Sequence, residues 1–263
     1  MDIALYLYYV LLGAAVGLAI GLTGVGGGSL MTPLLIFSGV PPKIAIGTDL
    51  LYAAITKTGG AASHFRQKTI RWDLVFILAG ASIPASLFTS YILYLMGEFN
   101  YGPMLSRALG FMLVASGAMI FFKRKVQGVD GVVHISESHW FNTHSKPITF
   151  IAGLFLGVLV TLSSVGAGAF CAVLLLTLYP RLSAIKIVGT DIAHAVPLTL
   201  IAGLGHFFML GNVDWHLLGG LLVGSLPAVH FGSKAARRIP NSILQPILAG
   251  LLLIIGVKFL IAP

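Results

Sequence analysis

Four ionisable residues lie inside apolar stretches of this sequence, where a charge is costly and usually serves a function. They are Asp49, Lys57, Asp191 and His194. Carboxylates and a histidine in such places can carry protons or cations. A lysine can pair with a carboxylate, neutralise an anion, or extend its charge to the membrane surface. These residue types indicate the movement of charge through an apolar environment.

Both aspartates follow Gly-Thr, in GTDLLYAA from Gly47 and GTDIAHAV from Gly189. Each could instead be a helix N-cap, because a capping carboxylate accepts hydrogen bonds from the first-turn N–H groups. His194 stands one helical turn after Asp191, so the two could form a proton relay, or His194 could be a buried structural histidine. The sequence leaves both alternatives open.

The glycine-rich stretch GLTGVGGGSLMTPLLIF, residues 21–37, interrupts what is otherwise an apolar helix. Non-helical backbone at membrane depth needs protein or a water-filled cavity to satisfy its polar groups. A helix that restarts at such a break presents free N–H groups and a positive dipole end, which favour an anion. We expect the substrate site at this break and at its copy later in the chain, formed by Thr23, Gly24, Gly26, Gly27, Gly28, Ser29, Ser163, Ser164, Gly166 and Gly168. The alternative is that the glycines only permit close helix packing.

The composition places these residues in a membrane protein. Of 263 residues, 57% are hydrophobic and only 9% are charged, against roughly 25% charged in soluble domains. Apolar runs near the ~20 residues that a membrane helix needs recur along the chain. The sequence therefore predicts an all-α polytopic membrane protein.

The chain also repeats itself. VLLGAAVGLAIGLTGVGGGSLMTPLL from Val10 aligns with FIAGLFLGVLVTLSSVGAGAFCAVLL from Phe150, and ASIPA from Ala81 aligns with GSLPA from Gly224. Each half contains five apolar segments, the second of which is too short to span. We therefore predict, in each half, a glycine-broken helical hairpin followed by three transmembrane helices, with about eight to ten membrane segments in all. The predicted units are a first repeat (residues 1–122), a cytoplasmic linker (residues 123–146) and a second repeat (residues 147–263).

Basic residues in the short loops predict the orientation, because Lys and Arg concentrate on the cytoplasmic side. If both hairpins return to their starting face, only Lys43, Arg107 and Lys258 lie outside. The inside loops then hold Arg66, Lys68, Arg71, Lys123, Arg124, Lys125, Lys146, Arg181, Lys186, Lys234, Arg237 and Arg238. Five elements per half is an odd number, so the second half enters the membrane from the opposite face. This arrangement is the inverted repeat of many secondary transporters, and both termini would be periplasmic.

Other classes of protein are disfavoured. The net charge of +8 is spread over loops, not gathered in a patch for nucleic acid. No G-x-x-x-x-G-K-[ST] motif is present to bind ATP. His134, His139 and His144 recur every five residues, which is not one helix face, so a solvated linker is favoured over a metal site. Scattered histidines and the single Cys171 offer no nucleophile with a base, and we expect no cofactor and no enzymatic activity.

The glycine-rich GLTGVGGGSLMTPLL, the paired GTDLLYAAITK and GTDIAHAVPLT, and GNVDW after His206 resemble the sulfite exporter TauE/SafE family of bacterial membrane transporters. The similarity covers nearly the whole chain. It implies a multi-pass protein of the bacterial inner membrane that moves small anions such as sulfite, sulfonates or other organosulfur acids. Many members of that family have Ser where this chain has Asp49, and the second glycine cluster is thinner than the first, so the two halves need not have identical roles.

The sequence thus predicts a proton-coupled exporter of a small anion that works by alternating access. Asp49, Lys57, Asp191 and His194 would adjust the charge during transport. The expected partners are the anionic substrate, protons and membrane lipid, with a homodimer left open and no nucleic acid. A passive anion channel and an intramembrane enzyme are the alternatives.

Overall fold

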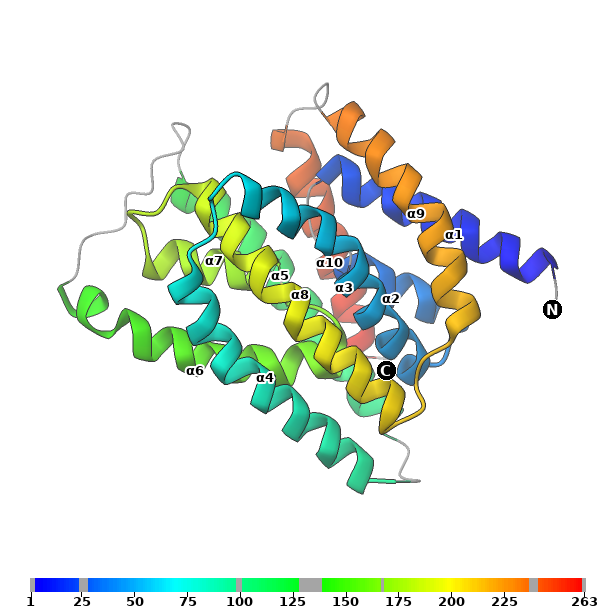
Figure 1. The fold of residues 1–263 in the computed structure, drawn as a ribbon. Helices are drawn as coiled ribbons and strands as arrows, with labels where there is room; N and C mark the ends of the chain where they lie inside the picture. Colours follow the sequence, from blue (N-terminus) through cyan, green and yellow to red (C-terminus); the bar gives the residue numbers. More distant parts are fainter. Residues whose placement is uncertain are drawn as a thin grey trace.

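The computed structural model describes residues 3–23, 28–97, 101–127, 139–166, 168–236 and 241–261. Within these ranges the chain is helical and contains no strand. The helices are α1 (Ile3–Thr23), α2 (Gly28–Phe37), α3 (Pro42–Arg66), α4 (Trp72–Leu95), α5 (Gly102–Gln127), α6 (His139–Ser163), α7 (Ala169–Leu178), α8 (Ala184–Phe208), α9 (Trp215–Ala236) and α10 (Asn241–Ile261). Figure 1 shows them packed into one bundle.

The two short helices confirm the predicted hairpins. α2 follows the long helix α1, and α7 follows α6; each short helix has 10 residues. At 1.5 Å per residue such a helix covers about 15 Å, roughly half of a hydrocarbon core. Each half of the chain therefore contains one long helix, one half-length helix and three further long helices.

The helices on either side of the linker extend beyond the apolar segments. α5 continues to Gln127 and α6 begins at His139, so both ends of the region expected to be a linker, residues 123–146, are helical. Hydropathy marks where a segment leaves the apolar layer, not where the helix ends. No Gly or Pro lies between Lys123 and Gln127, so nothing in the sequence stops α5 from continuing into the polar region. His139 and His144 lie in α6, and His134 lies outside the described residues.

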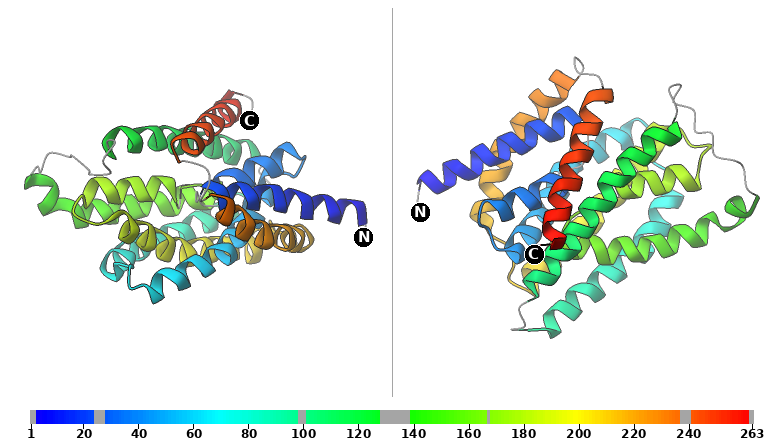
Figure 2. Two further views of the ribbon diagram at one scale, coloured as in Figure 1. Left: turned by 90° about the horizontal axis from the view of Figure 1, so that it is seen from above. Right: turned by 180° about the vertical axis from the view of Figure 1, so that it is seen from behind.

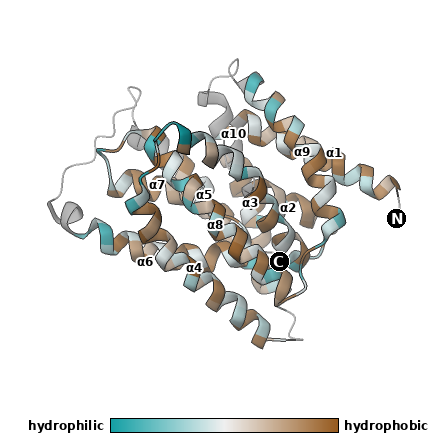
Figure 3. Ribbon diagram, viewed as in Figure 1, coloured by the Kyte–Doolittle hydropathy of each residue, from teal (hydrophilic) through white to brown (hydrophobic). Residues whose placement is uncertain are grey.

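Five helical segments are long and apolar enough to cross a membrane, judged by length and composition among the described residues: Ile3–Leu22, Trp72–Leu95, Gly102–Ile120, His144–Ser163 and Ala184–Phe208. Large apolar side chains cover their outer faces, with Phe76 69% exposed and Phe155 62% exposed. Figure 3 shows hydrophobic residues along α1, α4 and α6 and a hydrophilic turn between α3 and α4. This distribution suits lipid around the bundle and water at its ends.

The helices of the two halves pack against each other in matching pairs. α1 lies along α9, and its counterpart α6 lies along α4; α3 packs on α8 and α5 on α10. α1 runs opposite in direction to α6, and α3 opposite to α8, in Figures 1 and 2. This is the inverted-repeat fold, with α3 and α8 at its centre.

Glycines set the two outer crossings at repeat-matched positions. A Cβ atom on Gly17 of α1 would lie 2.6 Å from the Ser225 carbonyl oxygen of α9. A Cβ atom on Gly157, the counterpart in α6, would contact the Ser82 carbonyl of α4 and lie 2.8 Å from Ala85 Cβ. Neither helix pair could approach so closely with a side chain at these positions.

Candidate functional site

The break between α6 and α7 has the backbone geometry that the sequence predicts. Gly166 has a φ of +115° and Ser164 a φ of +59°, so the chain passes through conformations that glycine adopts without steric cost. The Ser163 hydroxyl donates to the Leu159 carbonyl (2.6 Å). The Gly168 N–H donates to the Gly166 carbonyl (2.9 Å), so this expected anion donor is engaged within the turn itself.

The matching break between α1 and α2 is only partly described. Thr23 ends α1 and Gly28 begins α2. Gly24, Gly26 and Gly27, and the side chains of Thr23 and Ser29, lie outside what the structure describes. Their predicted role in binding substrate therefore stays a prediction.

Asp49 joins the two halves of the chain. It is fully buried in α3, and Thr32 Oγ1 of α2 donates a hydrogen bond to its Oδ2 atom. The carboxylate also interacts with the Ser164 hydroxyl in the α6–α7 break. A charged group of the first half thus lies beside the glycine break of the second half.

The N-cap interpretation of both aspartates is wrong. α3 begins at Pro42 after Pro41, and α8 begins at Ala184 after Ser183. Both aspartates therefore lie in helix interiors, two turns past the start, where the first-turn N–H groups are out of reach. The proline at the first helical position starts α3 earlier than Gly-Thr-Asp would.

Asp191 occupies the corresponding position in α8. It is 5% exposed and interacts with the buried Cys171 thiol of α7. Asp49 and Asp191 are thus both placed between a long central helix and the short helix packed beside it. The structure brings the two predicted carboxylates into equivalent environments.

Lys57 links these two environments. It lies on α3, two turns after Asp49, and interacts electrostatically with both Asp191 and Asp49. Its charge also acts on His194 of α8. The four residues that the sequence predicts to adjust charge are therefore gathered around the α3–α8 contact.

His194 has a partner that the sequence did not indicate. Its Nε2 atom lies 2.8 Å from Ser82 Oγ of α4. Its Nδ1 atom has no hydrogen-bond partner among the described residues, so the relay from Asp191 to His194 stays a prediction. Ser82 lies two residues before Pro84 in the repeated ASIPA segment, and Thr32 lies beside Pro33. A hydroxyl within two residues of a proline in an apolar run was the available signal for both.

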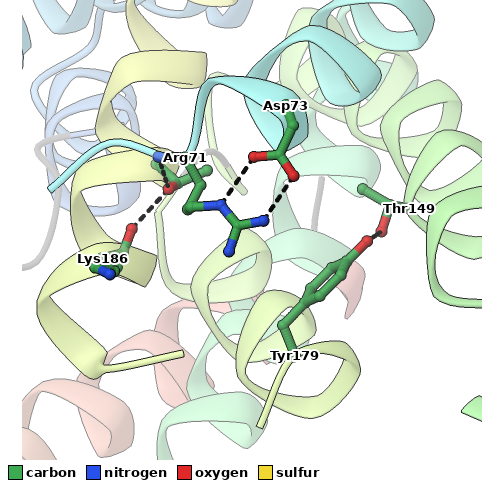
Figure 4. A network of polar contacts seen from close by, with 6 residues as sticks. Arg71, Asp73, Thr149, Tyr179 and Lys186 are labelled. Atoms are coloured by element: carbon green, nitrogen blue, oxygen red, sulfur yellow. Dashed lines mark hydrogen bonds and ion pairs between the residues drawn. The ribbon is translucent and has the colours of Figure 1, made fainter. Parts of the chain in front are cut away.

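A polar network closes one end of the central helices (Figure 4). Arg71 donates two hydrogen bonds to Asp73 (2.9 and 2.7 Å), and its backbone N–H donates to Thr190 Oγ1 (3.0 Å). The hydrogen bond to Asp73 raises the pKa of the Arg71 guanidinium above its usual value. Nearby, the Thr149 and Tyr179 hydroxyls lie 2.9 Å apart.

The other half of the chain repeats one of these contacts. The Asp214 N–H donates to Thr48 Oγ1 (3.1 Å), as the Arg71 N–H does to Thr190 Oγ1. Thr48 precedes Asp49 and Thr190 precedes Asp191. Next to each buried carboxylate, therefore, a threonine holds a loop of the opposite half.

Comparisons with known proteins agree with this architecture. The profile of the sulfite exporter TauE/SafE family matches residues 9–259. The chain is 39% identical to the probable membrane transporter protein YjnA of Bacillus subtilis over 95% of this chain and 98% of that protein. It is 28% identical to YdhB of the same organism, over 90% and 96% of the two chains, and 25% identical to MJ0441 of Methanocaldococcus jannaschii, over 96% and 94%. Both are also described as probable membrane transporter proteins.

No solved structure matches the chain. The family match covers both hairpins and all the central helices, and the relatives align along almost their whole length. The protein is therefore a membrane transporter and not an enzyme, and it belongs to the sulfite exporter TauE/SafE family.

Proposed function

We propose that this transporter is a proton-coupled exporter of a small sulfur-containing anion, such as sulfite or a sulfonate, that works by alternating access. The observation that carries the proposal is the charge cluster at the α3–α8 contact. Asp49 and Asp191 are buried, Lys57 interacts with both, and Ser164 of the α6–α7 break adjoins Asp49.

The charges of the cluster support proton coupling. Two ionised carboxylates and one lysine carry a net charge of −1. An anion that enters adds a further negative charge in a medium that stabilises charge poorly. Protonation of one carboxylate restores the net charge of the site to −1, because like charges at close range favour the neutral form of an acid. Proton binding and anion binding would then be linked, and the two ions would move together. Export in this mode requires the outward gradient of an anion accumulated in the cytoplasm to exceed the inward proton gradient.

The α6–α7 break supports an anionic substrate of small size. The positive end of the α7 dipole lies at the break, although the Gly168 and Cys171 N–H groups donate to the Gly166 carbonyl, and Ser164 adds a hydroxyl. The family name supplies the chemical class, because its profile is that of a sulfite exporter. Sulfite and the sulfonates share a compact oxyanion head that such donors can hold.

Unequal burial of the two central helices supports alternating access. Toward the end of α8, Thr199 and His206 are fully buried, and His206 Nε2 lies 3.0 Å from the Thr161 carbonyl. Of their counterparts in α3, His64 is partly exposed, whereas the charged end of Lys57 is buried. Two repeats of similar sequence therefore differ in accessibility, as expected when one side of a transporter is open and the other is closed.

The basic loops suggest which side is open. The positive-inside rule would place the exposed end of α3, which finishes at Arg66 and is followed by Lys68, at the cytoplasmic face. The structure would then correspond to an inward-facing state that loads an anion from the cytoplasm. In this orientation the repeats of residues 1–122 and 147–263 are inverted, both termini are periplasmic, and the protein lies in the bacterial inner membrane.

The test is anion flux in proteoliposomes. Uptake of labelled sulfite, a sulfonate and chloride is measured under an imposed pH gradient for the wild type and for Asp191→Asn. Asp73→Asn, a change of an exposed carboxylate at the helix end, serves as the control. We expect saturable, gradient-driven flux of a sulfur anion that Asp191→Asn abolishes and Asp73→Asn retains. A flux that does not depend on the imposed pH gradient would identify a passive channel. The absence of flux for every sulfur anion would reject the substrate class.

A further inference from the structure

Four buried side-chain oxygens around Asp49 lack a hydrogen-bond partner among the described residues. They are Asp49 Oδ1, Tyr52 Oη, Ser164 Oγ and Ser225 Oγ. None of these side chains is more than 4% exposed. Buried polar atoms are nearly always paired in native proteins, so a group of them calls for an occupant.

These oxygens belong to neighbouring side chains from three parts of the fold. Asp49 and Tyr52 lie three residues apart on α3 and so share one face of the helix. The Tyr52 hydroxyl adjoins Ser225 of α9 and interacts with Asp49, which in turn adjoins Ser164 in the α6–α7 break. The Tyr52 and Ser225 oxygens lie near each other, as do those of Ser164 and Asp49, but neither pair has the geometry of a hydrogen bond.

The other half of the chain provides a comparison. The repeat aligns Tyr52 with His194 and Ser225 with Ser82, and the His194–Ser82 pair is hydrogen bonded at 2.8 Å. The side chains at these two positions thus hydrogen bond to each other where they are His194 and Ser82, and lack a hydrogen bond where they are Tyr52 and Ser225. The difference leaves the Tyr52 and Ser225 hydroxyls available to a group that the protein itself does not supply.

The available donors define the chemistry of that partner. Tyr52, Ser164 and Ser225 each offer an O–H, and hydroxyl donors from three separate segments suit an oxyanion with several oxygens. A metal cation would have to bind close to the positive charge of Lys57, which acts on Asp49. A halide offers no separate oxygens to match the three donors.

We propose that Tyr52 and Ser225 are substrate-binding residues whose hydroxyls, together with that of Ser164, donate hydrogen bonds to the oxygens of a sulfite or sulfonate group beside Asp49 in its protonated form. This inference rests on the proposed function and deepens it, because it assigns selectivity for oxyanions to side chains outside the glycine breaks. Loss of one hydroxyl should weaken oxyanion binding and leave the folded protein intact.

The experiment compares Tyr52→Phe and Ser225→Ala with Ser116→Ala. Ser116 of α5 is a matched control, because its hydroxyl is also buried and lacks a hydrogen-bond partner among the described residues. For each variant we would measure the KM of sulfite flux in proteoliposomes, and the thermal stabilisation that added sulfite or chloride produces in detergent. The melting temperature without anion separates a folding defect from a binding defect.

We expect Tyr52→Phe and Ser225→Ala each to raise the KM for sulfite about ten-fold, as the loss of a hydrogen bond to a charged group predicts. Stabilisation by sulfite should shrink in both variants and persist in Ser116→Ala. A KM that is unchanged in both variants, with wild-type flux intact, would overturn the inference and leave the proposed function standing, with water as the occupant. Absence of wild-type flux and of stabilisation by sulfite would reject the proposed function and the inference with it.

Discussion

His194 on α8 and Ser82 on α4 form a buried hydrogen bond, with 2.8 Å between Nε2 and Oγ. Ser82 also lies at the crossing of α4 with α6, where Gly157 approaches its carbonyl. One residue therefore connects a central helix to the outer helix pair. This contact is the structural link between the charge cluster and the periphery of the bundle.

Removing the Ser82 hydroxyl should destabilise the protein. Ser82→Ala leaves His194 Nε2 buried without a partner, which costs about 1–3 kcal/mol. We expect a lower melting temperature in detergent. Ser233→Ala, which removes an exposed hydroxyl bonded only to the His230 carbonyl, should have little effect. Equal melting temperatures for the two variants would show that the His194–Ser82 bond contributes no stability.

Lys57 should be required as a cation. Lys57→Gln leaves Asp49 and Asp191 without the positive charge that acts on both. We expect sulfite flux in proteoliposomes to fall by at least ten-fold. Lys57→Arg, which keeps the charge, should retain part of the flux. Wild-type flux in Lys57→Gln would mean that the lysine only extends toward the membrane surface.

The glycines at the outer crossings should not tolerate a methyl group. In Gly157→Ala the new Cβ would lie 2.8 Å from Ala85 Cβ on α4, so the helices must separate. Overpacking of this kind costs about 1–3 kcal/mol, and the melting temperature should fall. Gly80→Ala is the matched control, because a Cβ atom at Gly80 meets nothing within 4 Å. Its stability should be unchanged or higher, since alanine favours helix.

Thiol labelling should detect the unequal burial of α3 and α8. His64 is partly exposed and its counterpart His206 is fully buried. We expect His64→Cys to react with a membrane-impermeant maleimide applied from the cytoplasmic side, and His206→Cys to react far more slowly. The native Cys171 is buried and provides the slow baseline. Similar labelling rates at the two positions would contradict an inward-facing state.

Much of the fold could be predicted from the sequence because the signals are local. The length of each apolar run distinguishes α2 and α7 from the spanning helices, and the alignment of the two halves reveals the repeat. The Gly166 turn was predictable too, since few residues other than glycine adopt its φ.

The site was harder to predict because its contacts join distant segments. Nothing in the sequence pairs Thr32 with Asp49, or Ser82 with His194, and a lone hydroxyl on an apolar helix resembles ordinary packing. Tyr52 and His194 occupy equivalent positions in the two halves but differ in chemistry, so the repeat alone did not predict a functional role for Tyr52. The Gly-Thr-Asp segments resemble helix starts, and only Pro42 before the first segment and Ser183 before the second mark the earlier starts of α3 and α8.

The pairing of α1 with α9 has a consequence for biogenesis. α1 leaves the ribosome well before α9, the helix that covers its glycine face, because α2 to α8 lie between them in the chain. Until then Gly13 and Gly17 have no protein surface to pack against, and lipid or the insertion machinery must shield them. Neither half can complete its own packing in isolation, so the native bundle assembles only after α9 and α10 have been synthesised.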